Sequence, residues 1–124
     1  MNVPLLDLKA QYRQIRMEVM AAIEAVCEEQ AFILGARVAD LEKEMQQYLG
    51  AAHAVGVASG TDAILLALMA CNVGPGDEVV TVPYTFFSTA GSISRLGAKP
   101  VFVDIKPDSF NMDPAYLEMA ITPR

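Results

Sequence analysis

The sequence predicts an α/β fold in which a mostly parallel sheet carries helices on both faces. Three short apolar stretches, residues 54–58, 78–82 and 100–105, have the composition of buried strands. Helical patterns separate them, and strands that alternate with helices form right-handed units with parallel strands. With 124 residues and 53% hydrophobic content, the chain is long enough for one domain with a core, over residues 1–124.

The first third of the chain predicts two amphipathic helices. Apolar residues recur at three-four spacing from Tyr12 to Val26, which indicates a helix over residues 8–28. Residues 32–35 interrupt the pattern. A second helix follows, with its apolar face ending at Leu49 and Gly50 at the position of a C-terminal cap.

After the first strand, helices and strands alternate to the end of the chain. Gly and Pro residues mark most of the boundaries, because they end helices and strands. The expected elements are a helix over 61–71, a turn over 74–77, a strand over 78–82 ended by Pro83, a helical connection over 86–96 stopped by Gly97, a strand over 100–105, and a helix over 114–121 that begins at Asp113 and Pro114.

Composition excludes several classes of partner. The chain has 15 acidic and 9 basic residues, a net charge of −6, so a nucleic acid or an anionic membrane surface would repel it. We expect no secretory signal, and no apolar run reaches the roughly 18–20 residues of a membrane span. Cys27 and Cys71 give no disulfide framework, which favours a cytoplasmic location. No Cys/His cluster indicates a metal site, and we interpret the single His53 as a strand-edge residue.

The most informative stretch is the corner where the first strand meets the next helix. Gly60, Thr61 and Asp62 begin that helix, where free backbone N–H groups and the positive end of the helix dipole favour an anion such as phosphate. The alternative is a plain turn in which Thr61 caps its own helix. The spacing matches neither the dinucleotide nor the nucleoside-triphosphate glycine motif. Asp62 would hinder a phosphate if it pointed inward, and would suit the dipole if it pointed outward.

A second candidate lies at the same edge of the predicted sheet. Phe86 follows the strand over 78–82, and ligands of parallel sheets bind at the carboxyl ends of the strands. Its ring could stack on a heteroaromatic ring, or it could be a core residue beside Phe87. Asp104 ends a predicted strand, where an acidic residue can be catalytic. Turn formation with the residues that follow explains it at least as well.

Several motifs occur in the order and spacing of a known family. They are Leu6-Asp7-Leu8, Phe32-Ile33-Leu34-Gly35, Ser59-Gly60-Thr61-Asp62-Ala63, Gly74-Pro75-Gly76-Asp77-Glu78-Val79, Pro83-Tyr84-Thr85-Phe86, Gly97 through Asp104, and Ala120-Ile121-Thr122-Pro123-Arg124. The chain resembles the N-terminal third of a DegT/DnrJ/EryC1/StrS sugar aminotransferase. The resemblance implies the N-terminal part of the large domain of the aspartate-aminotransferase fold (pyridoxal-phosphate fold type I), with the remainder of that domain and a small C-terminal domain outside residues 1–124.

The resemblance also implies an activity and a site. Members use pyridoxal 5'-phosphate, act as homodimers with shared active sites, and transfer an amino group from glutamate to a nucleotide-linked keto sugar, as in polysaccharide biosynthesis. By position, Gly60, Thr61 and Asp62 would lie at the cofactor phosphate, and Phe86 would stack on its pyridine ring. The family's cofactor-binding lysine is expected beyond residue 124.

Whether the catalytic lysine lies within residues 1–124 decides whether these residues can be active alone. None of Lys9, Lys43, Lys99 and Lys106 matches the catalytic lysine, so no catalytic residue is identified here. We expect the 124 residues by themselves to be inactive, and to expose sheet edges and aggregate. Two alternatives stay open: a dehydratase of the same family that lacks the lysine, and a non-catalytic domain that binds a phosphate ligand. The sequence does not identify the nucleotide, the sugar or the aminated carbon. Phe32, Ile33 and Tyr84 could approach the substrate or the partner subunit, and we interpret them as buried packing residues.

Overall fold

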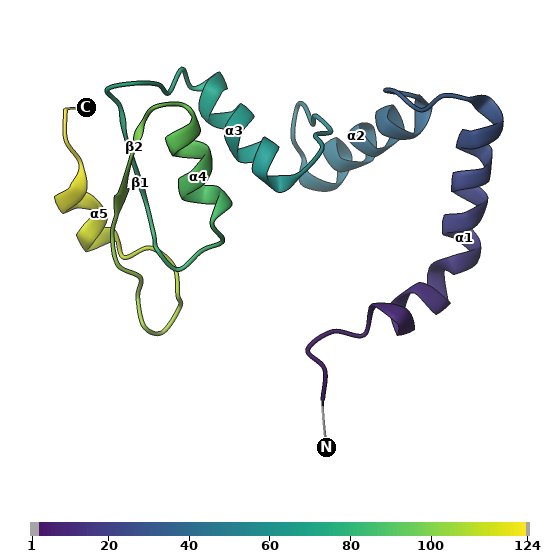
Figure 1. Ribbon diagram of the computed structural model, residues 1–124, viewed down its shortest axis with the longest axis horizontal. Helices are drawn as coiled ribbons and strands as arrows, with labels where there is room; N and C mark the ends of the chain where they lie inside the picture. The colour runs from purple at the N-terminus through teal and green to yellow at the C-terminus, as the bar shows by residue number, and fades with distance from the viewer. Residues whose placement is uncertain (1–2, 124) are drawn as a thin grey trace. The chain divides into compact units, whose positions relative to one another are not determined.

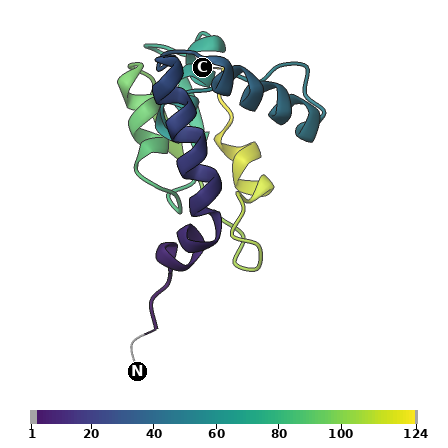
Figure 2. The same ribbon diagram turned by 90° about the vertical axis from the view of Figure 1, so that its right-hand side faces the viewer.

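The computed structural model describes residues 3–123 and divides into two compact units, Met1–Gly56 and Val57–Arg124 (Figures 1 and 2). Residues 1–2, at the N-terminus where no secretory signal is expected, lie outside the described residues. So does Arg124, the last residue of the final family motif.

The first unit contains the two predicted helices, α1 (Leu8–Glu29) and α2 (Ala36–Leu49). The Asp7 side chain begins α1 by accepting a hydrogen bond from the N–H of Ala10 at 2.9 Å. Gly50 ends α2 in a left-handed conformation, with φ +63°. Both helices are confirmed to within two residues at each predicted end.

The strand predicted over residues 54–58 is wrong for the part of the chain that the structure describes. No described residue forms a β ladder with this segment. The N–H of Gly56 instead donates to a side chain, to Oε1 of Glu42 at 2.7 Å. A strand needs a neighbour that takes up its backbone donors and acceptors, and residues 3–123 supply none here.

The second unit places a two-stranded parallel sheet beside two helices. Its elements are α3 (Gly60–Ala70), β1 (Glu78–Thr81), α4 (Ser88–Arg95) and β2 (Lys99–Phe102). The parallel pairing is confirmed, with Val79 opposite Pro100 and Val80 opposite Val101. Helix α4 contacts both strands and also packs against α3.

The connections of this unit follow their predicted turn chemistry. Asp77 closes the turn before β1: its N–H donates to the carbonyl of Gly74, and its carboxylate accepts from the N–H of Gly74 at 2.7 Å. Gly97 follows α4 with φ +77°, as its predicted role as a helix stop requires. The carboxylate of Glu78 accepts from Nζ of Lys99 at 2.9 Å and from Oγ1 of Thr122 at 2.8 Å, which ties β1 to β2 and to the end of the chain.

The second strand is shorter than predicted, because the chain folds back on itself after Val103. That residue still donates to the carbonyl of Thr81, but Ile105 forms an antiparallel bridge with Met112 instead of continuing the sheet. Asp113 then caps α5 (Pro114–Ala120), accepting from the N–H of Ala115 at 2.9 Å. Helices α4 and α5 lie on opposite sides of the two strands in Figure 1.

The core of the described residues is small and lies between α4 and the sheet. It consists of Thr81, Ser92, Ile93, Ala98 and Val103. Most large apolar side chains are exposed, including Leu66 on α3 and Phe102 on β2. None of the helices in residues 3–123 is long and apolar enough to cross a membrane.

Candidate active site

The candidate site begins at the first turn of α3, which Ser59 caps. Ser59 has an extended backbone (φ −161°, ψ 164°), and its hydroxyl oxygen accepts from the N–H of Asp62 at 3.1 Å. The same hydroxyl donates to Oδ2 of Asp62 at 3.1 Å. The first of these bonds is that of an N-cap, and the second joins the two side chains at the cap instead of reaching the backbone N–H of Ser59. Ser59, not Thr61, therefore caps the helix, and the reading of Thr61 as its own cap is wrong.

Two backbone donors remain available at this corner. The N–H groups of Gly60 and Thr61 have no hydrogen-bond acceptor among the described residues. A Cβ built on Gly60 would meet nothing within 4 Å, so the space beside the corner is open. Free amides at the positive end of a helix dipole bind anions well.

Asp62 belongs to the cap. Its carboxylate is bound to the Ser59 hydroxyl, and Asp62 is not among the residues that line the neighbouring cavity. The negative charge at this corner is therefore bound to the N-cap hydroxyl.

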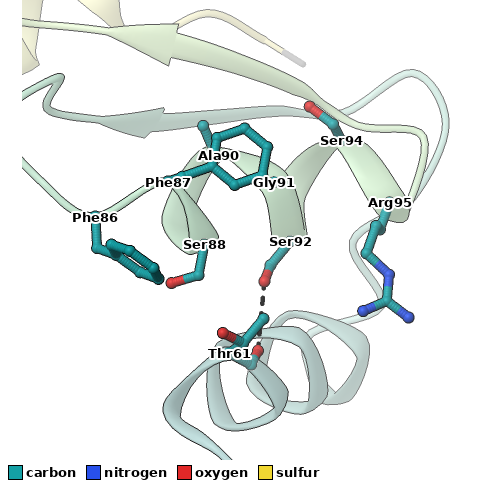
Figure 3. A pocket seen from close by; sticks show the side chains of 9 residues that line it. All are labelled: Thr61, Phe86, Phe87, Ser88, Ala90, Gly91, Ser92, Ser94 and Arg95. Atoms are coloured by element: carbon teal, nitrogen blue, oxygen red, sulfur yellow. Dashed lines mark hydrogen bonds between the residues drawn. The ribbon is translucent and has the colours of Figure 1, made fainter.

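A cavity of about 560 Å³ opens next to the corner, between α3 and α4 (Figure 3). It is lined by Thr61, Phe86, Phe87, Ser88, Ala90, Gly91, Ser92, Ser94 and Arg95. The structure thus brings together Thr61 and Phe86, two of the four residues predicted to bind a cofactor. Gly60 and Asp62 flank Thr61 but do not line the cavity.

Phe86 is exposed over 76% of its surface, so it is not a core residue of the described chain. The start of α4 fixes its backbone, because its carbonyl accepts from the N–H of Thr89 at 3.2 Å. The hydroxyls of Thr85 and Thr89, 3.0 Å apart, join the preceding loop to the same turn. Phe86 therefore lines the cavity from a backbone position that these bonds fix.

These features suit a ligand that has both a phosphate and an aromatic ring. The amides and the hydroxyl of Thr61 supply donors, Phe86 supplies a ring surface, and the volume lies in the usual range of about 300–1,000 Å³ for small-molecule sites. Pyridoxal phosphate has both parts, so the residues present fit it.

The other residues singled out in the sequence take no part in this site. Asp104 accepts from the N–H of Ile105 at 2.7 Å and does not line the cavity. Cys27 and Cys71 are free and exposed, and residues 3–123 contain no group of His, Cys, Asp or Glu that could hold a metal ion. His53 lies outside the lining of the cavity.

Sequence reasoning missed Ser92. This residue lies in the middle of α4, is fully buried, and donates from its hydroxyl to the carbonyl of Thr61 at 3.3 Å (Figure 3). The only signal in the sequence is a serine next to Ile93 on the buried side of the helix. The contact joins residues 31 positions apart, which no local pattern reports.

Comparison with known proteins gives one consistent result. The sequence model of the DegT/DnrJ/EryC1/StrS aminotransferase family matches residues 13–124. The chain is 54% identical to a Geobacillus stearothermophilus protein named "Pleiotropic regulatory protein", over 98% of this chain and 33% of that protein. It is 44% identical to the UDP-2-acetamido-2-deoxy-3-oxo-D-glucuronate aminotransferase of Pseudomonas aeruginosa, over 98% of this chain and 34% of that enzyme.

Solved structures agree with the sequence comparison. A Brucella abortus aminotransferase of the same description superposes with a TM-score of 0.92 at 43% identity, covering 97% of this chain and 32% of that chain. A Bacillus subtilis structure with bound cofactor PMP superposes with a TM-score of 0.93 at 32% identity, covering 98% of this chain and 28% of that chain. The predicted fold class is confirmed. The chain spans about a third of the length of the curated relatives that it matches.

Proposed function

The chain belongs to the DegT/DnrJ/EryC1/StrS aminotransferase family, and we propose that the intact protein is a pyridoxal-phosphate aminotransferase. It transfers an amino group from glutamate to a nucleotide-linked keto sugar. In this proposal residues 1–124 form the N-terminal segment of the large domain of a homodimeric enzyme with shared active sites. The names of relatives that aminate UDP-linked and dTDP-linked sugars support this substrate class.

The observation that carries the proposal is that Thr61 and Phe86 line one cavity. The amides of Gly60 and Thr61 and the Thr61 hydroxyl bind the cofactor phosphate. The Phe86 ring would offer a stacking surface to the pyridine ring and would keep water from that side of the site. When bound, the cofactor supplies an electron sink for the negative charge that develops next to the transferred nitrogen.

The remaining groups at the corner have structural roles in this proposal. Asp62 acts through its two bonds to Ser59, which keep the first turn of α3 in shape. None of the four lysines lines the cavity, and Lys99 is paired with Glu78. The lysine that holds the cofactor and moves the proton is therefore placed outside these residues in the proposal.

The intact mass of the protein made from its complete reading frame tests this proposal. The protein is incubated with pyridoxal phosphate and reduced with borohydride, which fixes a lysine-bound cofactor. A chain much heavier than 13.4 kDa with one pyridoxyl group supports the proposal, and conversion of the bound cofactor by glutamate completes it.

Two other results would replace it. A heavy chain without the pyridoxyl group indicates the dehydratase branch of the family, in which another residue stands in place of the lysine. A chain of 13.4 kDa without the group indicates a non-catalytic domain that binds a phosphate ligand.

A further inference from the structure

We propose that Ser92 is a positioning residue for the phosphate-binding corner of α3. The inference rests on the proposed function, because it assumes that the amides of Gly60 and Thr61 bind the cofactor phosphate. Ser92 has no exposed surface, and its hydroxyl donates to the carbonyl of Thr61 at 3.3 Å from the neighbouring helix (Figure 3).

The contact closes a continuous chain of hydrogen bonds through one peptide group. The peptide that joins Thr61 and Asp62 accepts from Ser92 at its carbonyl and donates to Oγ of Ser59 at its N–H, at 3.1 Å. Ser59 in turn donates to the carboxylate of Asp62. Hydrogen bonds in such a chain polarise and strengthen one another.

This chain determines the orientation of the first turn of α3. Ser59 holds the turn from the solvent side of the cap, and Ser92 holds the same peptide group from α4. Because that peptide group is held at its N–H and at its carbonyl, the neighbouring N–H groups of Thr61 and Gly60 are held in one orientation. A preorganised pair of donors binds an anion more tightly than a mobile pair, because no ordering cost falls on the binding step.

The same hydroxyl also links the two halves of the site. Phe86 lies at the start of α4, and Ser92 lies on α4 one to two turns later. The bond from Ser92 to Thr61 therefore fixes the position of the phosphate-binding corner relative to the Phe86 ring. Ser92 itself contacts neither group of the cofactor in this assignment.

Packing alone does not account for a hydroxyl here. An alanine would fill nearly the same volume, and a buried hydroxyl is unfavourable unless it is hydrogen-bonded. In residues 3–123 no buried side-chain oxygen or nitrogen lacks a partner, and the partner of Ser92 is the carbonyl of Thr61.

The test compares the binding of pyridoxal phosphate with that of pyridoxal, which lacks the phosphate. Both dissociation constants are measured by absorbance and fluorescence on the cofactor-free complete protein, for wild type, Ser92→Ala and Ser92→Cys. The control is Ser109→Ala, the same chemical change at an exposed loop serine. We expect Ser92→Ala to lower the preference for the phosphorylated form about 3- to 10-fold. Cysteine, a weak donor of similar size, should fall between alanine and wild type.

Each other outcome has a definite meaning. A preference within twofold of wild type in both variants overturns the inference, as does an equal loss for the two ligands, which indicates general packing damage. If Ser92→Ala fails to fold, Ser92→Cys decides by the same ratio. If wild type binds both ligands equally, the phosphate assignment fails, and with it the proposed site. Loss of the preference in Ser92→Ala alone leaves the proposed function intact and supports the positioning role.

Discussion

The ring of Phe110 contacts the ring of Tyr84, with centroids 5.5 Å apart and planes inclined by 31°, although the backbone of Phe110 is left-handed at φ +58°. An aromatic residue at positive φ is strained, at a cost of about 1–3 kcal/mol. The contact draws the loop over residues 106–111 toward the loop that follows β1. The strain is balanced by this contact and by the bond from the N–H of Phe110 to the carbonyl of Lys106.

The aromatic contact predicts coupling between these two residues. In the complete protein, Tyr84→Ala and Phe110→Ala should together show a coupling free energy of about 0.5–1.5 kcal/mol in a double-mutant cycle of urea unfolding. Phe110→Gly should destabilise less than Phe110→Ala, because glycine adopts φ +58° without strain. Additive effects of the two alanine substitutions would show that the rings contribute nothing to each other.

The phosphate corner predicts an effect of removing a single backbone donor. Gly60 is the first residue of α3, a position that accepts proline, and Ser59 already has the extended backbone that precedes proline. Gly60→Pro should therefore leave the melting temperature nearly unchanged while it weakens pyridoxal-phosphate binding about 10-fold, from the loss of one charge-assisted hydrogen bond.

The matched control for that change is Gly60→Ala, which keeps the N–H and has open space for its methyl group. Its affinity for the cofactor should lie within about twofold of wild type. Equal affinity of the proline and alanine variants would exclude the Gly60 amide from phosphate binding.

The two adjacent phenylalanines predict unequal effects on the cofactor. Phe86→Leu should weaken cofactor binding about 3- to 10-fold, because leucine keeps apolar area but removes the stacking surface. Phe87→Leu should have a smaller effect, since the Phe87 ring lies against Gly91 of α4, where an added Cβ would come within 3.1 Å of it. Fluorescence titration with the cofactor measures the affinity of both variants. A larger loss of affinity in Phe87→Leu than in Phe86→Leu would show that Phe87, not Phe86, stacks on the ring.

The glycine after α4 predicts a stability effect that is independent of the site. Gly97 has φ +77°, and a Cβ there would lie 3.0 Å from Cγ of Pro75. Gly97→Ala should lower the free energy of unfolding by about 1–2 kcal/mol from backbone strain alone. Gly74→Ala, where a Cβ meets nothing within 4 Å, should change it by less than about 0.5 kcal/mol. Chemical denaturation of the complete protein measures both, and equal effects would contradict the argument.

The parts of the fold that the sequence predicts well are those with local causes. The caps at Gly50 and Asp113 and the stop at Gly97 depend on backbone conformations that a few neighbouring residues determine. The segment over 54–58 has the composition of a strand, but a ladder is a pairing between distant segments. Composition does not show whether a partner lies within the same 124 residues.

In the candidate site, too, the residues with a local sequence signal could be predicted and the residue that depends on tertiary packing could not. Thr61 and Phe86 could be found because each follows a predicted strand, which places both at one edge of the predicted sheet, and the structure brings both to one cavity. The capping role of Ser59 was also accessible in principle, since Ser59 and Asp62 have the spacing of a capping box. Ser92 was not accessible, because its function depends on how α4 packs against α3.

Pro100 sets the direction in which this sheet can grow. The N–H groups of Lys99 and Val103 point toward β1, where they donate to Asp77 and Thr81. Alternate amides of a strand face opposite sides, so position 100 faces away from β1, and proline has no N–H to offer there. A strand added beside β2 would lose a ladder bond at that position, whereas β1, from Glu78 to Thr81, contains no proline and loses no donor in this way. A strand that joined this sheet would therefore pair more favourably beside β1, and the proline makes the outer side of β2 a poorer partner for other chains.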